Sequence, residues 1–297
     1  MIIDSQEAVT SAVLEAMSQT PNPRLREVMT SLVRHLHAFA REVRPTEEEF
    51  EQGIEFLIQL GKLTTDTHNE AILASDSLGV STLVCLLNNG NNGATETAAA
   101  LLGPFWRMNS PRTEDGGSIV RSPTPGDPLF MTGRVTDPQG RPVEGAEVDV
   151  WHASPVGMYE NQDPNQADMN LRGKFTTDEN GRFRLRTVKP AGYPIPTHGV
   201  VGKLIQAQKR HPYRPAHLHF LIYKPGYRTL VTQVFSDDDE HLDSDVVFGV
   251  TNHLVGDYHR HESEPAPDPD VTGPWYSLDY TFVVEPGEAK LPKPPIA

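Results

Sequence analysis

The sequence predicts a mainly β protein with an α-helical N-terminal part. Up to about residue 102, apolar side chains recur at intervals of three and four, which is the spacing of amphipathic helices. After Pro104, prolines and glycines become frequent, and short β-branched or aromatic runs alternate with turn signals, as in an antiparallel β-sandwich. We therefore expect a helical domain over residues 1–102 and a β-sandwich domain over residues 103–297 that carries the functional site.

The first helices have recognisable boundaries. Apolar stripes over residues 9–17 and 25–36 predict two amphipathic helices. Thr46 can cap a third helix, Glu49 completes a capping box three residues later, and Gly61 is expected to end the helix.

A further helix is expected over residues 72–87, closing at the Asn- and Gly-rich loop 88–93. Such apolar stripes on short helices can pack on the rest of the chain or on a second copy of it. The helical part is therefore a candidate dimerisation or linker domain.

Short strands separated by turns make up the second part. Residues 137–140 form a turn signal after the first expected strand, and Asn180-Gly181 is a tight hairpin signal. The proline-rich tail beyond Glu285 is expected to lie on the surface. The expected strands span residues 129–135, 146–151, 174–177, 182–188, 217–223, 230–235 and 280–284.

The composition narrows the possible partners and compartments. The chain has 297 residues, with 26 Lys and Arg against 40 Asp and Glu, and a formal net charge of −14. Such an acidic protein is not expected to bind nucleic acid or anionic membranes. The single cysteine, Cys85, excludes a disulfide within the chain and favours a reducing compartment. Because we find no signal peptide pattern and no apolar stretch long enough to span a bilayer, we expect a cytoplasmic protein.

The stretch 214–220 places two histidines at alternate positions of a run that is typical of a strand. Alternate side chains of a strand point to the same face, so His217 and His219 would lie side by side and could share a metal ion. The same tripeptide occurs at 35–37 in a helical stripe, where positions i and i+2 diverge by roughly 200°. Only the pair at 217 and 219 is therefore expected to bind one ion.

Two histidines leave a metal site half complete. A tetrahedral zinc site needs further His, Cys or carboxylate ligands, yet the chain has one cysteine and no His-Glu-x-x-His run. Tyr159 follows a strand that runs into a glycine-containing loop, and Tyr193 lies beside prolines that hold the backbone extended. Loops at the ends of a sandwich can bring such side chains to a common point.

Several motifs, taken in order along most of the chain, resemble the intradiol ring-cleaving dioxygenases, the family of catechol and hydroxyquinol 1,2-dioxygenases. The matching stretches are 102–105, 148–153 with Gly157 and Tyr159, 172–178, 193–196, 214–220 and 232–235.

The resemblance implies a non-haem Fe(III) ion, one per subunit. Its implied ligands are Tyr159, Tyr193, His217 and His219. Phenolate donors agree with this metal, because a hard anionic oxygen suits trivalent iron better than zinc. Arg214 and Gln233 match positions beside the substrate, where Arg214 would stabilise an electron-rich diolate and Tyr193 would take a proton.

The resemblance also implies the partners. The substrates would be a small aromatic diol or triol and O2, and the ring would be cleaved between its two adjacent hydroxyl-bearing carbons. The family further suggests a homodimer joined through the helices, with an apolar channel there that can hold a phospholipid.

The stretches 73–80, 93–97 and 101–105 are more similar to the hydroxyquinol branch than to the catechol branch. Hydroxyquinol, benzene-1,2,4-triol, would then be cleaved to 3-hydroxy-cis,cis-muconate (maleylacetate). A buried acceptor can discriminate strongly for an extra substrate hydroxyl, and Asp76 would supply it. The expected substrate contacts are Leu73, Asp76, Gly103, Pro104 and Phe105.

Three alternatives stay open from the sequence. A catechol 1,2-dioxygenase would give cis,cis-muconate instead. A non-catalytic β-sandwich binding module would leave the histidines and tyrosines incidental, and a hydrolase would use a divalent metal. Asp76 also has a competing role as a helix cap or a surface charge.

Overall fold

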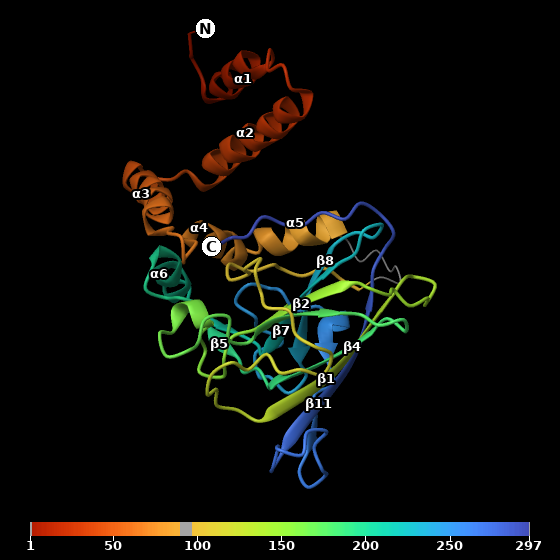
Figure 1. Ribbon diagram of the computed structural model, residues 1–297. Coiled ribbons are helices and arrows are strands. Elements are labelled where there is room, and N and C mark those ends of the chain that lie inside the picture. The colour runs from red at the N-terminus through yellow and green to blue at the C-terminus, as the bar shows by residue number, and fades with distance from the viewer. Residues whose placement is uncertain (1, 90–96, 297) are drawn as a thin grey trace. The chain divides into compact units, whose positions relative to one another are not determined.

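The computed structural model describes residues 2–89 and 97–296. Most of the predicted loop 88–93 and of the stretch 93–97 therefore lies outside the described residues. The chain forms two compact units, residues 1–58 and residues 59–297. Figure 1 shows the helices and strands of both units.

The first unit consists of α1 (Gln6–Met17), α2 (Pro23–Val43) and most of α3 (Glu47–Leu63). The predicted capping box opens α3: Thr46 Oγ1 accepts from Glu49 N at 3.2 Å, and Glu49 Oε2 accepts from Thr46 N at 2.8 Å. The helix continues two residues past the predicted end at Gly61, because a glycine weakens a helix without breaking it.

No residue of α1, α2 or α3 is fully buried in the described chain. The apolar stripes of α2 and α3 are exposed instead, which leaves a surface that a partner can cover. The exposed apolar side chains are Leu25, Val28, Leu32, Leu36, Phe39 and Val43 on α2 and Phe50, Ile54, Leu57 and Ile58 on α3.

The helix predicted over residues 72–87 is two helices, α4 (Glu70–Ser77) and α5 (Val80–Asn89). The single-helix prediction was wrong because the chain turns at Gly79, whose φ of 71° is a left-handed conformation that glycine adopts readily. Among the described helices, none alone is long and apolar enough to cross a membrane, although α4 and α5, bent by 77°, pass that test as a pair. In Figure 1, α6 (Val200–Ala207) lies beside α4.

Two main sheets form the rest of the second unit. The four-stranded sheet has the order β10 (His259–His261), β11 (Trp275–Val283), β1 (Pro128–Thr136), β4 (Arg182–Val188). The five-stranded sheet has the order β3 (Arg172–Thr176), β2 (Glu147–Trp151), β7 (His217–Tyr223), β8 (Leu230–Ser236), β9 (Val255–Gly256). A small ladder pairs β5 (Tyr193–Pro194) with β6 (Tyr213–Arg214).

The prediction of an antiparallel sandwich is correct only in part, because both main sheets are mixed. β11 pairs with β1 in parallel, and β9 pairs with β8 in parallel. β1 and β11 are far apart in sequence, so no hairpin forces them to run in opposite directions.

The predicted hairpin at Asn180-Gly181 is also only partly correct. The tight turn forms, with Gly181 at a φ of 71° and its N–H bonded to Asp178 O at 2.9 Å. The flanking strands do not pair, however, since β3 belongs to the five-stranded sheet and β4 to the four-stranded sheet. The turn therefore joins the two layers.

Apolar side chains from both sheets meet in the main core. Leu218 and Phe220 of β7 are fully buried there, together with Phe183 of β4 and Phe282 of β11. Gly133 of β1 makes room for Phe183, because a Cβ at this position would lie 2.1 Å from the phenyl ring.

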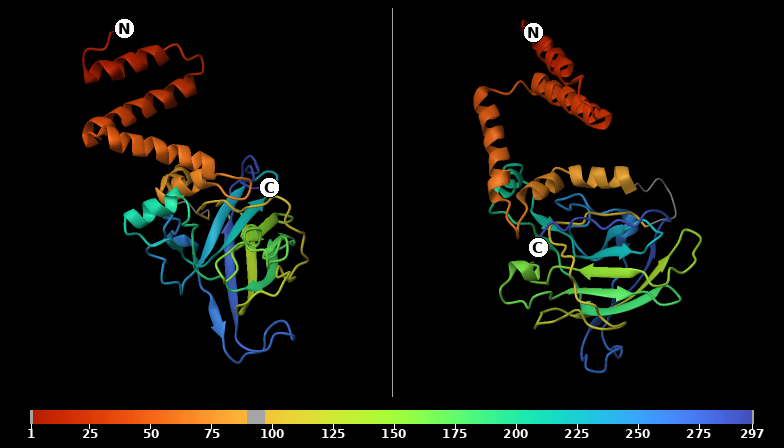
Figure 2. Two further views of the ribbon diagram at one scale, coloured as in Figure 1. Left: turned by 90° about the vertical axis from the view of Figure 1, so that its left-hand side faces the viewer. Right: turned by 45° about the horizontal axis from the view of Figure 1, so that its top comes forward.

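A second, aromatic cluster lies on the other face of the five-stranded sheet. It contains Phe105, Trp106, Trp151, Ala153, Tyr159, Tyr193, Leu221 and Ile296. Ile296 is only 5% exposed, so the C-terminal tail does not simply lie on the surface as predicted. The tail returns toward α4 (Figures 1 and 2).

Candidate metal centre and active site

His217 and His219 project from the face of β7 opposite to the main core, as their alternation with Leu218 and Phe220 predicts. Both histidines are 2% exposed. Trp151 of β2 is the register partner of His219, and the two rings stack with centroids 4.7 Å apart and planes 9° from parallel. The neighbouring strand therefore holds the His219 ring in place.

The two imidazoles face each other through their Nε2 atoms, which lie 3.2 Å apart. His217 Nδ1 lies 2.7 Å from the carbonyl oxygen of Pro215, so the neutral ring donates there and keeps its lone pair on Nε2. Burial, together with the charge of Arg214, lowers the pKa of His217 to about 3. Burial also lowers the pKa of His219 well below its ordinary value, so both rings are neutral at pH 7.

Two loops bring Tyr159 and Tyr193 to the same place. Their hydroxyl oxygens lie 3.3 Å apart. Tyr159 caps the short 3-10 helix Glu160–Gln162, and its ring stacks on Phe105 with centroids 4.5 Å apart. Tyr193 lies in β5, directly opposite Arg214 of β6, and its ring centroid is 5.7 Å from that of His217.

These donors fit a hard, highly charged metal ion. Burial raises the pKa of Tyr159 well above its ordinary value, and the neighbouring Tyr193 adds to this, so the Tyr159 phenol needs a nearby cation to ionise. The buried Nδ1 of His219 has no hydrogen-bond partner among the described residues. In that part of the chain, no group of three or more His, Cys, Asp or Glu is placed to hold a metal ion. The tyrosine hydroxyls are therefore the donors that can complete a site at the histidine pair.

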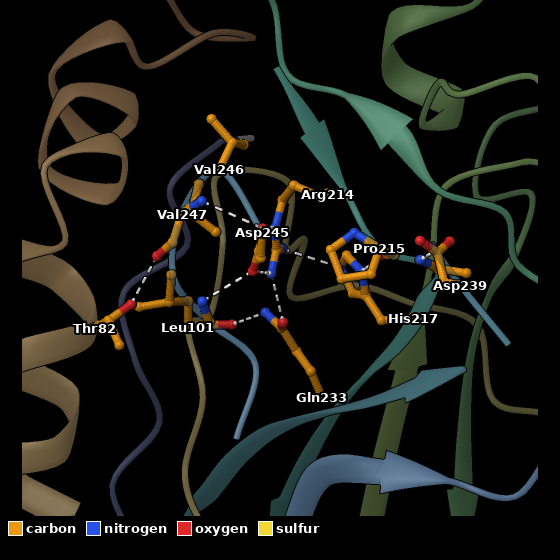
Figure 3. A network of polar contacts seen from close by, with 12 residues as sticks. Thr82, Leu101, Arg214, Pro215, His217, Gln233, Asp239, Asp245, Val246 and Val247 are labelled. Carbon is orange, nitrogen blue, oxygen red and sulfur yellow. Dashed lines mark hydrogen bonds and ion pairs between the residues drawn. The ribbon is translucent and has the colours of Figure 1, made fainter. Parts of the chain in front are cut away.

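Arg214 and Gln233 lie near His217 (Figure 3). Arg214 Nη1 is 3.1 Å from His217 Nε2, and Arg214 Nη2 donates to Gln233 Oε1 at 2.9 Å. Gln233 Nε2 in turn donates to Leu101 O at 2.7 Å. Burial alone would lower the pKa of Arg214, but Asp245 and the tyrosines outweigh it and raise the pKa, so the guanidinium stays charged.

A cavity next to these groups brings the predicted substrate contacts together. Its walls include all five of the predicted residues, and they also include Tyr193, Arg214 and His219. The full lining is Leu73, Asp76, Leu101, Gly103, Pro104, Phe105, Tyr193, Ile195, Pro196, Arg214, His219 and Val247.

Asp76 lies inside this cavity and not on the surface. It belongs to α4 and is 5% exposed, which rules out the alternative of a surface charge. Burial raises the pKa of Asp76. A hydrogen bond from Ser81 and the charge of Arg214 lower the pKa, but burial has the larger effect. Asp76 is therefore a buried polar group facing an otherwise largely apolar wall.

Comparisons with known proteins identify the family. The sequence matches the family described as "Dioxygenase" over residues 101–285 and the one described as "Catechol dioxygenase N terminus" over residues 22–96. The chain belongs to the intradiol ring-cleaving dioxygenase family.

Members of the dioxygenase family are similar over nearly the whole chain. The 6-chlorohydroxyquinol 1,2-dioxygenase of Cupriavidus pinatubonensis is 44% identical, covering 95% of this chain and 98% of that protein. The hydroxyquinol 1,2-dioxygenase of Rhizobium sp. is 41% identical, with 94% and 95% covered. The crystal structure of hydroxyquinol 1,2-dioxygenase from Pseudomonas putida DLL-E4 gives a TM-score of 0.87 at 42% identity, covering 95% of this chain and 99% of that chain. The family resemblance predicted from the motifs is confirmed.

Sequence reasoning missed several residues of this dioxygenase site. Asp245 pairs with Arg214, and Leu101, Ile195, Pro196 and Val247 line the cavity. Apolar residues such as Val247 carry no chemical signal in the sequence. The pairing of Arg214 could have been anticipated, because a buried guanidinium needs a carboxylate partner.

The contribution of the C-terminal tail to the site was also not predicted from the sequence. An outer recess shares Asp76, Leu101 and Gly103 with the inner cavity and is also lined by residues 293–295. Anchored by the buried Ile296, the tail thus forms part of the wall near the site of this dioxygenase.

Proposed function

We propose that this chain is a hydroxyquinol 1,2-dioxygenase that uses a non-haem Fe(III) ion. It would cleave benzene-1,2,4-triol with O2 between the two adjacent hydroxyl-bearing carbons, giving 3-hydroxy-cis,cis-muconate (maleylacetate). Both oxygen atoms of O2 enter the product, so that the broken ring bond leaves two carboxyl groups. The observation that carries the proposal is the meeting of two tyrosine hydroxyls and two neutral imidazoles beside a buried arginine.

In this proposal, Tyr159, Tyr193, His217 and His219 hold the iron. The bound iron supplies a positive charge that draws electron density from the aromatic diolate and makes its ring reactive toward O2. Two phenolates offset much of a trivalent charge, which makes the ion less costly to bury among aromatic side chains. Tyr193 also takes a proton from a substrate hydroxyl, since a phenolate is a competent base for a phenol.

Arg214 stabilises the electron-rich diolate, because its guanidinium stays charged in a site from which water is largely excluded. Gln233 supports Arg214 through the 2.9 Å hydrogen bond between them. Leu73, Gly103, Pro104 and Phe105 form the apolar wall of the substrate cavity. Asp76 accepts a hydrogen bond from the third hydroxyl of the substrate.

The test is oxygen uptake with hydroxyquinol and with catechol, together with identification of the ring-opened products. We expect hydroxyquinol to be cleaved with the higher kcat/KM and to consume one O2 per ring. Faster catechol cleavage, with cis,cis-muconate as the product, would instead identify a catechol 1,2-dioxygenase. An iron-free protein that cleaves neither diol would support the non-catalytic binding module.

We further propose that two copies associate through the helices. Helices α2, α3 and α5 carry exposed apolar side chains that a homodimer could cover, and the family resemblance supports an apolar channel at the dimer interface that could hold a phospholipid. The apolar side chains of α5 exposed in the second unit are Val80, Leu83, Val84, Leu86 and Leu87. Light scattering after gel filtration tests the dimer, and mass spectrometry of an organic extract tests the lipid.

The domain boundary and the compartment also stay proposals. We propose that residues 1–102 form the dimerisation domain and residues 103–297 the catalytic domain, and the gap between the two family matches supports this division. We propose that the enzyme acts in the cytoplasm. Expression of residues 103–297 alone tests the first point, since a monomer that still binds iron is expected.

A further inference from the structure

Asp245 lies in the loop between β8 and β9, and its side chain is almost completely buried. Its carboxylate accepts four hydrogen bonds (Figure 3). Oδ1 accepts from Arg214 Nε at 3.1 Å and from Val247 N at 3.3 Å. Oδ2 accepts from Arg214 Nη2 at 3.1 Å and from Gly249 N at 2.9 Å.

These contacts determine which end of Arg214 faces the metal centre. Asp245 holds Nε and Nη2, and Gln233 holds Nη2 as well. Nη1 is the remaining nitrogen, and it points at His217 Nε2 at 3.1 Å. His217 would use its Nε2 lone pair to hold a metal ion, which would leave the N–H groups of Arg214 Nη1 available to the substrate.

The same carboxylate also fixes part of the cavity wall. Val247 lines the substrate cavity, and its backbone N–H is bonded to Asp245. The carbonyl oxygen of Val247 accepts a hydrogen bond from Thr82 Oγ1 of α5 at 3.0 Å. In Asp245→Asn the remaining side-chain oxygen can still accept from the N–H of Val247, so this substitution is directed at the guanidinium and not at the wall.

We infer that Asp245 is a positioning residue for the ring-cleaving reaction: it directs Arg214 Nη1 toward the substrate. The inference rests on the proposed function. Asp245 does not touch the reacting atoms, so its effect passes through Arg214 and appears mainly in kcat. Misplacement of such a group by about 1 Å can cost about 100-fold in rate.

Asp137 offers a matched control. Its carboxylate makes the same kinds of contact, accepting from Arg141 Nε at 2.6 Å and from the backbone N–H groups of Gln139 and Arg141. It lies in the turn after β1 and does not line the substrate cavity. Asp137→Asn therefore reports the effect of losing a buried carboxylate that bonds an arginine away from the site, although Arg141 itself is exposed.

The experiment compares iron content, kcat and KM for hydroxyquinol in the full-length wild type, Asp245→Asn, Asp137→Asn, Arg214→Gln and the Arg214→Gln/Asp245→Asn double variant. We expect Asp245→Asn to retain iron and to lose about 10- to 100-fold in kcat, with a smaller change in KM. Asp137→Asn should keep the wild-type kcat. In the Arg214→Gln background, the Asp245 substitution should change kcat less than about twofold, since the group it positions is gone.

If the loss of kcat in the double variant equals the product of the losses in the two single variants, Asp245 acts independently of Arg214. That result would overturn the inference. Wild-type kcat in a folded, iron-loaded Asp245→Asn variant would also overturn it. If Asp245→Asn does not fold, Asp245→Glu keeps the charge but displaces it, and an undiminished kcat there would contradict the positioning role. A wild type without iron or ring cleavage would instead reject the proposed function itself.

Discussion

His217 and His219 present their Nε2 atoms to each other at 3.2 Å, while Leu218 between them enters the main core. The strand thus separates a polar face, which carries the proposed iron ligands, from an apolar face that packs in the core. Both histidines are neutral and buried, and the tyrosines reach them from two loops. Neutral nitrogen donors and phenol oxygens are thereby brought together at one end of the five-stranded sheet.

Asp76→Ala should weaken the preference for hydroxyquinol over catechol. Asp76 is the buried acceptor in the cavity, and only hydroxyquinol has a third hydroxyl to bond with it. We expect kcat/KM for hydroxyquinol to fall about 10- to 100-fold, with a smaller loss for catechol. Oxygen-uptake kinetics with both substrates measure this, and an equal loss for both would show that Asp76 does not bind the third hydroxyl.

His152 should make the stability of the protein depend on pH. Its Nδ1 lies 2.8 Å from Ala153 O and its Nε2 lies 2.7 Å from Thr187 Oγ1. Burial lowers the pKa of His152 to about 4, from 6.5 in the unfolded chain. The unfolded state therefore binds more protons between these values, and this part of the stability is present above pH 6.5 and is lost as the pH falls toward 4.

Urea unfolding of the metal-free protein at pH 7.5 and pH 5 measures this effect. The wild type should lose about 2 kcal/mol through His152 between the two pH values, and His152→Asn should lack this component. Equal pH dependence in the two proteins would show that His152 does not titrate as described.

Asp149 should give the stability a pH dependence of the opposite sign to that of His152. Burial raises the pKa of Asp149 to about 6, despite Lys174 and hydrogen bonds from Ser110 and Trp106. The native state therefore holds a proton that the unfolded chain loses near pH 3.8, so stability from this group falls as the pH rises from 4 to 6. Asp149 Oδ1 has no hydrogen-bond partner among the described residues.

Asp149→Asn should accordingly be more stable than the wild type at pH 7.5, by about 1 to 3 kcal/mol, and the gain should shrink at pH 4. Thermal or urea unfolding at the two pH values provides the measurement. A variant that is less stable than the wild type at pH 7.5 would indicate that the ionised carboxylate contributes favourably.

Tyr159→Phe should lower the iron content and abolish ring cleavage together, because it removes a proposed ligand but keeps the ring that stacks on Phe105. Tyr258→Phe is the matched control: Tyr258 is also buried, and its hydroxyl donates to Val234 O at 3.1 Å away from the site. Measurement of the iron content of both purified variants tests whether Tyr159 is an iron ligand. Iron retained in Tyr159→Phe would remove Tyr159 from the ligand set.

Local patterns were sufficient to predict the histidine pair. The alternation of polar and apolar residues in β7 fixes which side chains share a face, so His217 and His219 could be placed together from the sequence. Tyr159 and Tyr193 come from loops, whose paths follow no periodic rule, and family motifs were needed to associate them with the histidines.

The partner of Arg214 and the strand directions could not be predicted in the same way. Residues 237–245 contain six carboxylates, and nothing in their spacing distinguishes Asp245 from its neighbours. Asp237, Asp238 and Glu240 are exposed, while Asp239 Oδ2 accepts from Ala216 N at 2.8 Å. Strand periodicity does not encode direction, so the parallel pairing of β11 with β1 was missed as well.

The visible absorption spectrum of the purified protein, before and after anaerobic addition of hydroxyquinol, tests the ligand set most directly. Two tyrosinates on Fe(III) should give a red-brown protein with a charge-transfer band, and the diol should shift this band when it binds beside Tyr193. A colourless, iron-free protein that still cleaves hydroxyquinol would contradict the proposed metal centre.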